Sequence, residues 1–335
     1  MRTAWICACA LACWGAAACS EGGEKAAKKR IFSPEDPPKV VASALEELPV
    51  EKLDQNPAMA RRVLEMGAAE TTERIGPYQF KATTHFKWSA GSKTVELSET
   101  RSLIAGPGGV NGDFHGQIDN SEDQGLEVIR VGGNVYARNR YGKFRQRQRD
   151  RGMAEREREE IFAALHSYDA LFLGRLALTP NGATTYQRRP GFKYGVTLAR
   201  DQNRSLDSTP KPPLPLPKSG VDPGTVRRSA FWEQRQPKSV KGEIIVDQKT
   251  GVVLHARLEG RLAVPAARGN PEAELDLALE SALSNVGVNP ALEAPKDFLP
   301  DVDKPLGIAA ALDRFGIPRG GRSSDGGVEE EDEER

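Results

Sequence analysis

The sequence predicts an α+β fold that is mostly β: a long curved antiparallel sheet, or half-barrel, covered by a few helices that include one long central helix. Three observations lead to this prediction. Several long segments alternate apolar and polar side chains with a period of two, which indicates strands with one dry and one wet face. One long stretch in the middle of the chain has the helical period instead. Hydrophobic residues make up only 38% of the chain, which favours elements with one face in water.

The first residues have the pattern of an export signal. Arg2 precedes an apolar run over residues 4–18, and the chain then reaches Cys19. A transmembrane helix needs about 20 apolar residues, so this run is too short to span a bilayer. We interpret residues 1–18 as a signal peptide, and a short buried helix in a cytosolic protein is the alternative.

The same N-terminus resembles the type II signal peptides of bacterial lipoproteins, whose lipobox ends in a cysteine that is diacylated and becomes the mature N-terminus. This resemblance implies a lipid on Cys19, and Ser20 after it implies an anchor in the outer membrane, facing the periplasm. Ala16 and Ala18 also form an A-x-A site, at which an ordinary signal peptidase would leave Cys19 as a free thiol. All four cysteines lie at or before Cys19, so the exported body has no thiol to pair, which favours lipidation.

The rest of the chain divides by composition. Residues 19–37 carry Gly, Lys and Pro without an apolar period, and we interpret them as the lipidated cysteine and a flexible tether with a reach of about 20–25 Å. Residues 38–300 are predicted to form a single curved-sheet domain with a proline-rich loop at 201–224. Residues 301–335 are predicted to form a C-terminal extension with a disordered acidic tail.

Helices are expected before the first strand. We expect a short helix at residues 40–48 and another that begins at Asn56 and Pro57, because an N-cap side chain followed by proline suits a first helical turn. After this helix the period changes from 3.6 to 2. The predicted strands of the first half cover residues 78–88, 95–104, 114–120, 126–131 and 135–138.

The predicted central helix covers residues 155–178, and Pro180 is expected to end it. Its apolar side chains share one face: Ile161, Leu165, Tyr168 and Phe172. Further strands are predicted at residues 184–188, 192–199, 243–247, 252–262 and around 275–283. A sheet of so many long strands must curl, and its apolar inner face then needs a helix or a ligand to cover it.

This order of elements resembles the lipoprotein carriers and acceptors of the LolA and LolB type and the mycobacterial lipoproteins of the LppX and LprG type. The resemblance is one of architecture and rests on no diagnostic motif. It implies a concave apolar face that holds acyl chains. The residues expected to line that face are Tyr78, Phe80, Phe86, Trp88, Leu275, Leu277 and Leu279.

Three patterns that could carry chemistry are better explained as structure. His166 and Asp169 share a helix face, but no serine or cysteine lies in a nucleophile elbow. Asp119, Ser121 and Asp123 match the start of a calcium loop whose glycine and last glutamate are missing, so a turn is the better interpretation. With four scattered histidines, we predict neither a metal site nor a cofactor nor an enzyme activity.

A run of arginines has two interpretations. Arg145, Arg147, Arg149 and Arg151 alternate at period two, and on a strand they would form a cationic stripe that binds an anion such as a lipid headgroup. The alternative, which we favour, is a solvated strand end whose charge is balanced by the glutamates that follow. The PxxP spacing of Pro212 and Pro215 is better explained by a stiff loop than by docking to a partner.

The chain carries 47 basic and 47 acidic residues, so its charge gives no reason to expect nucleic acid. The leading hypothesis is a membrane-anchored periplasmic lipoprotein, not an enzyme, that binds an acyl chain or another apolar ligand. The alternative is an envelope scaffold whose sheet is fully packed and which binds a protein partner.

Overall fold

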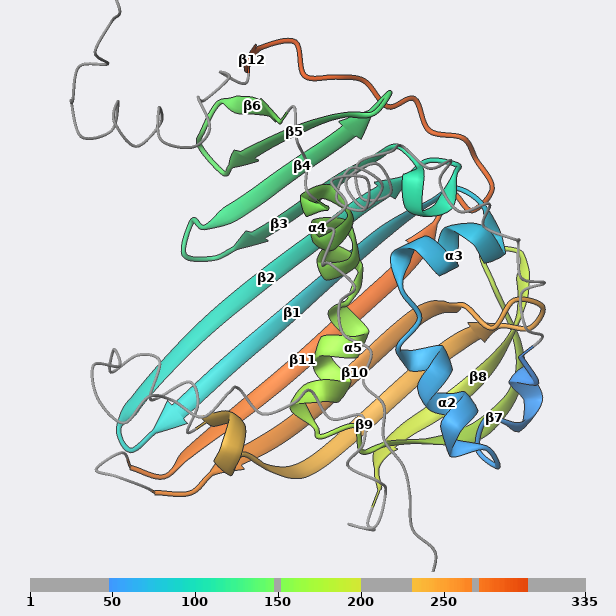
Figure 1. Ribbon diagram of the computed structural model, residues 1–335. Helices are drawn as coiled ribbons and strands as arrows, with labels where there is room; N and C mark the ends of the chain where they lie inside the picture. The colour runs from blue at the N-terminus through green and yellow to red at the C-terminus, as the bar shows by residue number, and fades with distance from the viewer. Residues whose placement is uncertain (1–47, 148–151, 200–230, 267–270, 301–335) are drawn as a thin grey trace, which may run out of the picture. The chain divides into compact units, whose positions relative to one another are not determined.

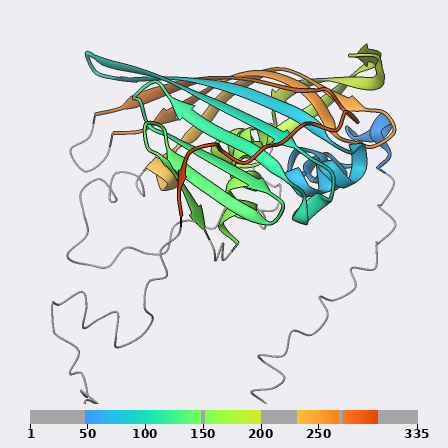
Figure 2. The same cartoon turned by 90° about the horizontal axis from the view of Figure 1, so that it is seen from above.

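The computed structural model describes residues 48–147, 152–199, 231–266 and 271–300, and these residues form a twelve-stranded sheet. The sheet is antiparallel except at one edge, it is curved and not closed, and its helices lie on the concave side (Figures 1 and 2). The strand order is β12-β6-β5-β4-β3-β2-β1-β11-β10-β9-β8-β7. The predicted fold class, a mostly β half-barrel with a few helices, is confirmed.

The elements are bounded as follows. The strands are β1 (Tyr78–Ala90), β2 (Lys93–Ala105), β3 (Phe114–Asn120), β4 (Gly125–Val131), β5 (Asn134–Asn139), β6 (Phe144–Arg147), β7 (Leu176–Tyr186), β8 (Arg189–Leu198), β9 (Gln236–Asp247), β10 (Val253–Val264), β11 (Ala273–Ser284) and β12 (Phe298–Leu299). The helices are η1 (Val50–Lys52), α2 (Pro57–Leu64), α3 (Ala68–Ile75), η2 (Gly109–Asn111), α4 (Met153–Phe162) and α5 (Ala164–Leu171).

The alternation predicted for the first strand is present in β1. Tyr78, Phe80 and Ala82 are buried on the concave face, while Lys81 and His85 are exposed on the convex face. β1 pairs along its whole length with β2 on one side, and with β11 from Gln79 onward on the other. The pairing of β1 with β11 therefore joins the two halves of the chain into one continuous sheet.

Helix α2 begins where the sequence predicts. Asn56 Oδ1 accepts a hydrogen bond from the backbone N–H of Met59 at 3.1 Å, and Pro57 is the first helical residue. The next helix, α3, has a glycine at its N-cap position, which has no side chain to accept a hydrogen bond. The carboxylate of Glu159 in α4 caps α3 instead, because it accepts from the backbone N–H groups of Ala68 at 2.6 Å and Ala69 at 2.9 Å. The helix predicted at residues 40–48 lies almost wholly outside the described residues.

The prediction of one central helix over residues 155–178 is wrong. The segment forms two shorter helices, α4 and α5, that meet at Ala163, and the strand β7 begins at Leu176. The helix ends early because Leu173 and Gly174 adopt positive φ angles of 62° and 63°. Pro180 lies inside β7, which is an edge strand of the sheet. The outer side of β7 has no neighbouring strand among the described residues, so an edge position tolerates the missing N–H of proline.

The end of α5 is also held by a distant side chain. Arg235 is 7% exposed and donates to the backbone oxygens of Leu171 at 2.9 Å and Ala170 at 3.0 Å. Because the last carbonyls of a helix have no partner within the helix, this guanidinium satisfies them.

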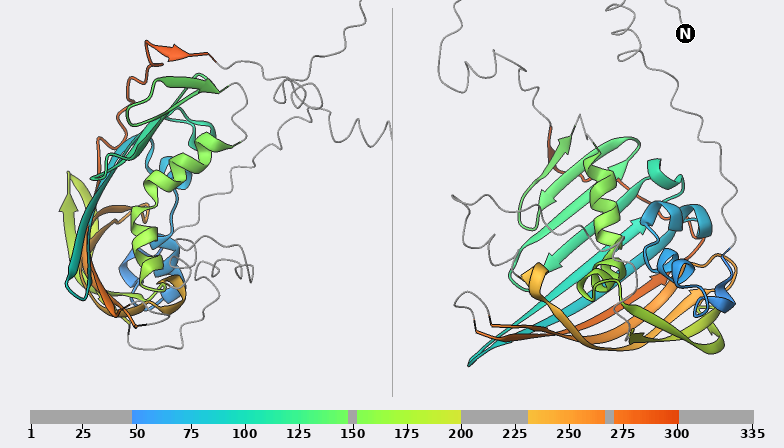
Figure 3. Two further views of the ribbon diagram at one scale, coloured as in Figure 1. Left: turned by 90° about the vertical axis from the view of Figure 1, so that its left-hand side faces the viewer. Right: turned by 60° about the horizontal axis from the view of Figure 1, so that its bottom comes forward.

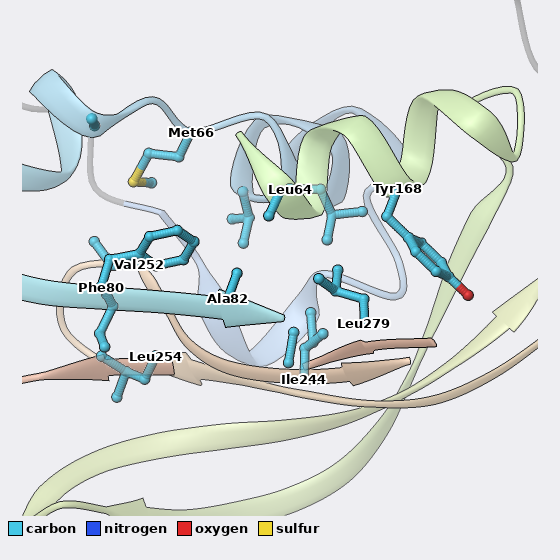
Figure 4. Packing of buried hydrophobic residues seen from close by; sticks show 14 of the residues in the cluster. Leu64, Met66, Phe80, Ala82, Tyr168, Ile244, Val252, Leu254 and Leu279 are labelled. Atoms are coloured by element: carbon cyan, nitrogen blue, oxygen red, sulfur yellow. The ribbon is translucent and has the colours of Figure 1, made fainter. Parts of the chain in front are cut away.

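The core lies between the concave face and the helices, and Figure 4 shows its packing around Phe80, Met66 and Leu279. The predicted apolar stripe of the central helix faces this core: Ile161, Tyr168 and Phe172 are at most 1% exposed. Tyr168 and Phe172 fit against β10 because residue 260 is glycine. A Cβ there would lie 2.5 Å from the Tyr168 hydroxyl and closer still to the Phe172 ring.

Candidate functional site

The concave face of the sheet is covered over part of its area only, and Figure 3 shows the helices gathered in the curve of the sheet. Under the helices the face is filled by side chains. Phe162 lies against Tyr78 and Phe80, with ring centroids 5.6 and 4.8 Å apart. Tyr78 and Phe80, two of the residues expected to line a ligand face, are therefore core residues.

The space left between the helices and the sheet is small. A cavity of about 30 Å³ is bounded by apolar residues of α2, α4 and β1 and by the polar side chains of Thr71, His166 and Ser281. The Thr71 hydroxyl and the His166 Nδ1 atom are buried without a hydrogen-bond partner among the described residues. Because one water molecule needs about 10–15 Å³ of such volume, the cavity has room for one or two waters and not for an acyl chain.

Beyond the helices, the concave face remains apolar and becomes exposed. Phe86 lies opposite Leu97, and Trp88 lies opposite Val95, in the paired halves of β1 and β2. Val95 is 50% exposed and Leu97 is 36% exposed, while the two aromatic side chains are half-buried. We call these four residues the open apolar strip.

The exposed fraction of the apolar side chains on the concave face decreases from β2 toward β10. In the same rows, Leu277 lies opposite Phe86 and Leu275 lies opposite Trp88, and they are only 3% and 8% exposed. The next strand along is covered by α5, and Phe231 packs edge-on against Trp88 with ring centroids 6.0 Å apart. The strip is thus the uncovered margin of an otherwise buried apolar surface.

A polar row separates the open apolar strip from the helix-covered core. Thr84 lies opposite Glu99 and Ala82 lies opposite Arg101, so all four residues share the concave face with the strip. The Arg101 guanidinium contacts a Glu99 carboxylate oxygen at 2.6 Å and donates to the Glu160 backbone oxygen, also at 2.6 Å. The strip therefore ends at a paired acid and base, with Glu99 next to Leu97 and Arg101 beyond it.

The convex face of the sheet carries a different feature, an open trough of about 490 Å³. Its side chains are mostly charged, and they neutralise one another in pairs: Lys87 with Glu96 at 3.0 Å, Arg261 with Asp276 at 2.6 Å, and Lys241 with Glu259 at 2.8 Å. The hydrogen bond from Lys241 lowers the pKa of Glu259. This trough is polar and balanced in charge, so it does not suit an apolar ligand.

The other predicted site residues fall in several places. Leu279 is buried in the core, and Arg145 and Arg147 are exposed on β6, opposite Ala137 and Val135. Neither guanidinium has a hydrogen-bond or ion-pair partner among the described residues. Cys19, Arg149 and Arg151 lie outside the described residues, as do the loop at 201–224 and residues 301–335.

The sequence did not identify Val95 and Leu97 as site residues. Both fall at the start of a predicted strand, and their alternation with Glu96 indicated only that they share a face. A two-residue turn fixes the register of a hairpin, and in that register Val95 and Leu97 lie opposite Trp88 and Phe86, which were on the predicted ligand face. The hairpin register was therefore the signal that could have identified Val95 and Leu97.

The patterns set aside as structure have ordinary surroundings. Asp169 is 3% exposed, it accepts from the backbone N–H of Leu176 at 3.3 Å, and burial raises its pKa to about 6. The residues between β3 and β4 form a turn in which Asn120 Oδ1 accepts from the backbone N–H groups of Glu122 and Gln124. Within the described residues, no group of three or more His, Cys, Asp or Glu side chains is arranged to hold a metal ion.

The described helices are all short, and none of them combines the length and the apolar character that crossing a membrane requires.

Comparison with known proteins gives structural likenesses only. No protein-family model matches the chain, and no curated protein matches its sequence. The chain is similar to the solved structure of LprF from Mycobacterium bovis, with a TM-score of 0.33 and 10% identity over 71% of this chain and 97% of that chain. It is similar to the lipoprotein LppX of Mycobacterium tuberculosis, with a TM-score of 0.26 and 8% identity over 71% of this chain and 100% of that one. It is also similar to the MucA/MucB complex of Pseudomonas aeruginosa, with a TM-score of 0.23 and 14% identity over 70% of this chain and 58% of that one. These TM-scores are low, and we base no argument on the likenesses.

Proposed function

We propose that this protein is a lipid-anchored protein of the bacterial envelope that holds an acyl chain against the open apolar strip. The observation that carries the proposal is the exposure of Val95 and Leu97 beside half-buried Phe86 and Trp88 on the concave face. An acyl chain laid along these side chains would remove apolar surface from water on both molecules. At about 25 cal/mol per Å² of apolar surface, covering two aliphatic side chains of this kind contributes roughly 1–3 kcal/mol from the protein side.

The two ends of the strip differ, which gives the ligand a direction. Arg101 lies beyond the Leu97 end, held by Glu99 and by the end of α4, and the hairpin turn at Gly91 and Ser92 lies beyond the Val95 end. The polar headgroup of a lipid would lie at the end with the Glu99–Arg101 pair, and its chain would run toward the turn. A membrane anchor at Cys19 would place the strip close to a supply of such lipids.

Tryptophan emission offers a direct test of this proposal. Only two tryptophans follow residue 19, Trp88 and Trp232, so the W232F variant reports on the strip alone. We expect palmitate to shift the Trp88 emission to shorter wavelength with saturation. Leu97→Asp should weaken this response at least about tenfold, because it places a charge on the strip.

Val110→Asp is the matched control, since Val110 is 39% exposed in η2, away from the strip. An emission that palmitate leaves unchanged, or an equal effect of both aspartate variants, would refute the proposed site.

The anchor has a separate test. We infer that Cys19 carries a diacylglycerol group and that the chain resides at the outer membrane, facing the periplasm. Intact mass measurement of the native protein should show an acylated N-terminal cysteine, and Cys19→Ser should release the protein from the membrane fraction. A free Cys19 thiol would indicate cleavage at the A-x-A site instead.

Arg145 and Arg147 extend the proposal to anionic partners. Two guanidiniums with no partner among the described residues, spaced two apart on a strand, can bind an anionic headgroup. We expect Arg145→Glu with Arg147→Glu to weaken sedimentation with anionic vesicles and to leave palmitate binding unchanged.

A second candidate function rests on the small size of the cavity under the helices. A packed interior with room for only one or two waters suits an envelope scaffold that binds a protein partner and no lipid. Crosslinked envelope proteins, together with an absence of copurified lipid, would favour the scaffold. In either role, we propose that the protein is not an enzyme.

A further inference from the structure

β2 extends well beyond the strand beside it. β3 pairs with β2 only from Glu99 to Ala105, while β2 itself begins at Lys93 (Figure 1). The outer edge of residues 93–97 therefore has no neighbouring strand among the described residues. At Ser98 the edge is already occupied by Ser121 of the turn after β3.

The backbone groups at this edge point outward. The oxygen of Ser98 accepts from the N–H of Ser121 at 2.8 Å, and the N–H of Ser98 donates to the Ser121 hydroxyl at 3.0 Å. Because the direction of peptide groups alternates along a strand, those of Thr94 and Glu96 point the same way, away from β1. This edge thus offers two donors and two acceptors to another strand.

Among the described residues, the other edges of the sheet are protected and this one is not. β7 contains Pro180 and a register shift between Pro180 and Ala183, and β6 is covered by the short strand β12. Residues 93–97 contain no proline and no bulge. Two of the side chains here, Val95 and Leu97, are apolar and exposed. The charge of Glu96, whose side chain is on the convex face, is balanced by Lys87 at 3.0 Å.

We propose that two copies of this chain join along residues 93–97 of β2 as a two-fold antiparallel strand pair centred on Val95. In this register Thr94 faces the partner's Glu96, and Val95 faces the partner's Val95. The unpaired edge is five residues long, ends at the hairpin turn on one side and at Ser98 on the other, and is symmetric about Val95. This register is therefore the one that uses the whole edge.

Side-chain chemistry also fits a second copy. Thr94 and Glu96 form hydrogen-bonded pairs across the junction, which gives four backbone hydrogen bonds in total. On the concave face, Lys93 lies opposite the partner's Leu97 and diagonal to the partner's Glu99, which is a favourable pair. On the convex face the two Glu96 side chains lie diagonal to each other, and each is neutralised by its own Lys87 at 3.0 Å. The pairing is isologous and uses up both exposed edges, so it closes as a dimer and does not grow into a fibre.

The junction is short, and membrane anchoring would support it. Five residues on each side bury less surface than a stable interface in solution needs. Two chains tethered to one membrane meet at high effective concentration, which favours such a contact without further buried area. A covalent trap in the membrane is therefore the suitable assay.

The full-length protein in its membrane allows this trap, because no cysteine follows Cys19. At the centre of the pair, two Val95 residues would lie about 4.5 Å apart between Cα atoms, within the range for a disulfide. We expect Val95→Cys to give a disulfide-linked dimer on mild oxidation, above the level of the parent chain. Leu97→Cys is the matched control, since two such residues would lie roughly 13 Å apart in this register.

Proline at position 94 removes an outward N–H and leaves the ladder to β1 intact. We expect Thr94→Pro to lower the crosslinked fraction of Val95→Cys about tenfold, because two symmetric hydrogen bonds are lost. Glu96→Pro serves the same purpose if Thr94→Pro fails to fold. A Val95→Cys chain that crosslinks no more than the parent would overturn the proposal, and so would Leu97→Cys crosslinking equally or a folded proline variant that retains the crosslink.

Discussion

Gly260 is the position at which a single added methyl group tests how α5 packs on the sheet. A Cβ atom added to Gly260 would point at the Phe172 ring and would lie 2.5 Å from the Tyr168 hydroxyl. Both aromatic residues are at most 1% exposed, and their ring centroids lie 4.8 Å apart, so neither can swing into solvent without opening the core. Overpacking a dense core costs about 1–3 kcal/mol, and we expect Gly260→Ala to lower the free energy of unfolding by this amount.

The assay is urea unfolding followed by circular dichroism, with two comparisons. Gly195 in β8 has only the side chain of Asn181 within 3.2 Å of an added Cβ, so Gly195→Ala should be neutral or stabilising by up to about 1 kcal/mol. Adding Phe172→Leu to Gly260→Ala should cost less than the sum of the two single changes, since the smaller side chain makes room for the methyl group. A loss below about 0.5 kcal/mol, or additive single changes, would refute this packing account.

Three further predictions concern ionisation and helix ends. Burial raises the pKa of Asp169 from 3.8 to about 6, so the folded state holds this proton more tightly than the unfolded chain does. The resulting stability is fully present below about pH 3.8 and is lost as the pH rises through about 6. The wild-type chain should therefore gain stability between pH 7 and pH 4, and Asp169→Asn should remove roughly 1–3 kcal/mol of that gain. A pH profile of the free energy of unfolding that Asp169→Asn leaves unchanged would contradict this prediction. Glu159→Gln should lower the free energy of unfolding by about 1–2 kcal/mol because it weakens the cap on α3, while Glu160→Gln on the exposed side of α4 should be nearly neutral. Asn56→Ala should lower it by about 1 kcal/mol through loss of the α2 cap, and Asn56→Asp should retain most of the stability; equal losses in both variants would contradict the capping role.

Much of the sheet could be predicted because alternation is local. The period of two in β1 identified its buried face residue by residue, and β3 was predicted with its observed bounds. The start of α2 was predictable for the same reason, since Asn56 and Pro57 act on the first turn alone.

The break in the central helix could not be predicted because tertiary contacts cause it. Leucine rarely adopts a positive φ, yet Leu173 does so at 62°, beside Gly174. The preceding carbonyls are held by Arg235, which is more than sixty residues away in the sequence. A helical apolar period continued through this point, and Pro180 drew the predicted end too far along the chain.

The candidate site depends on relations between elements that a single segment does not contain. Phe80 and Phe86 share one face of one strand, and the sequence treats them alike. Phe80 is core because Phe162 covers it, whereas Phe86 belongs to the open apolar strip, in which the facing Leu97 is 36% exposed. The exposure of Val95 likewise follows from the short length of β3 and the register of the hairpin.

The central claim is that the open apolar strip holds an acyl chain. Native mass spectrometry of the full-length protein extracted from its membrane tests this most directly. We expect the acylated chain to carry a noncovalently bound lipid that is present in Val110→Asp and lost in Leu97→Asp. A folded protein that carries no lipid in either form, or that keeps the same lipid when Leu97 is replaced, would contradict the claim.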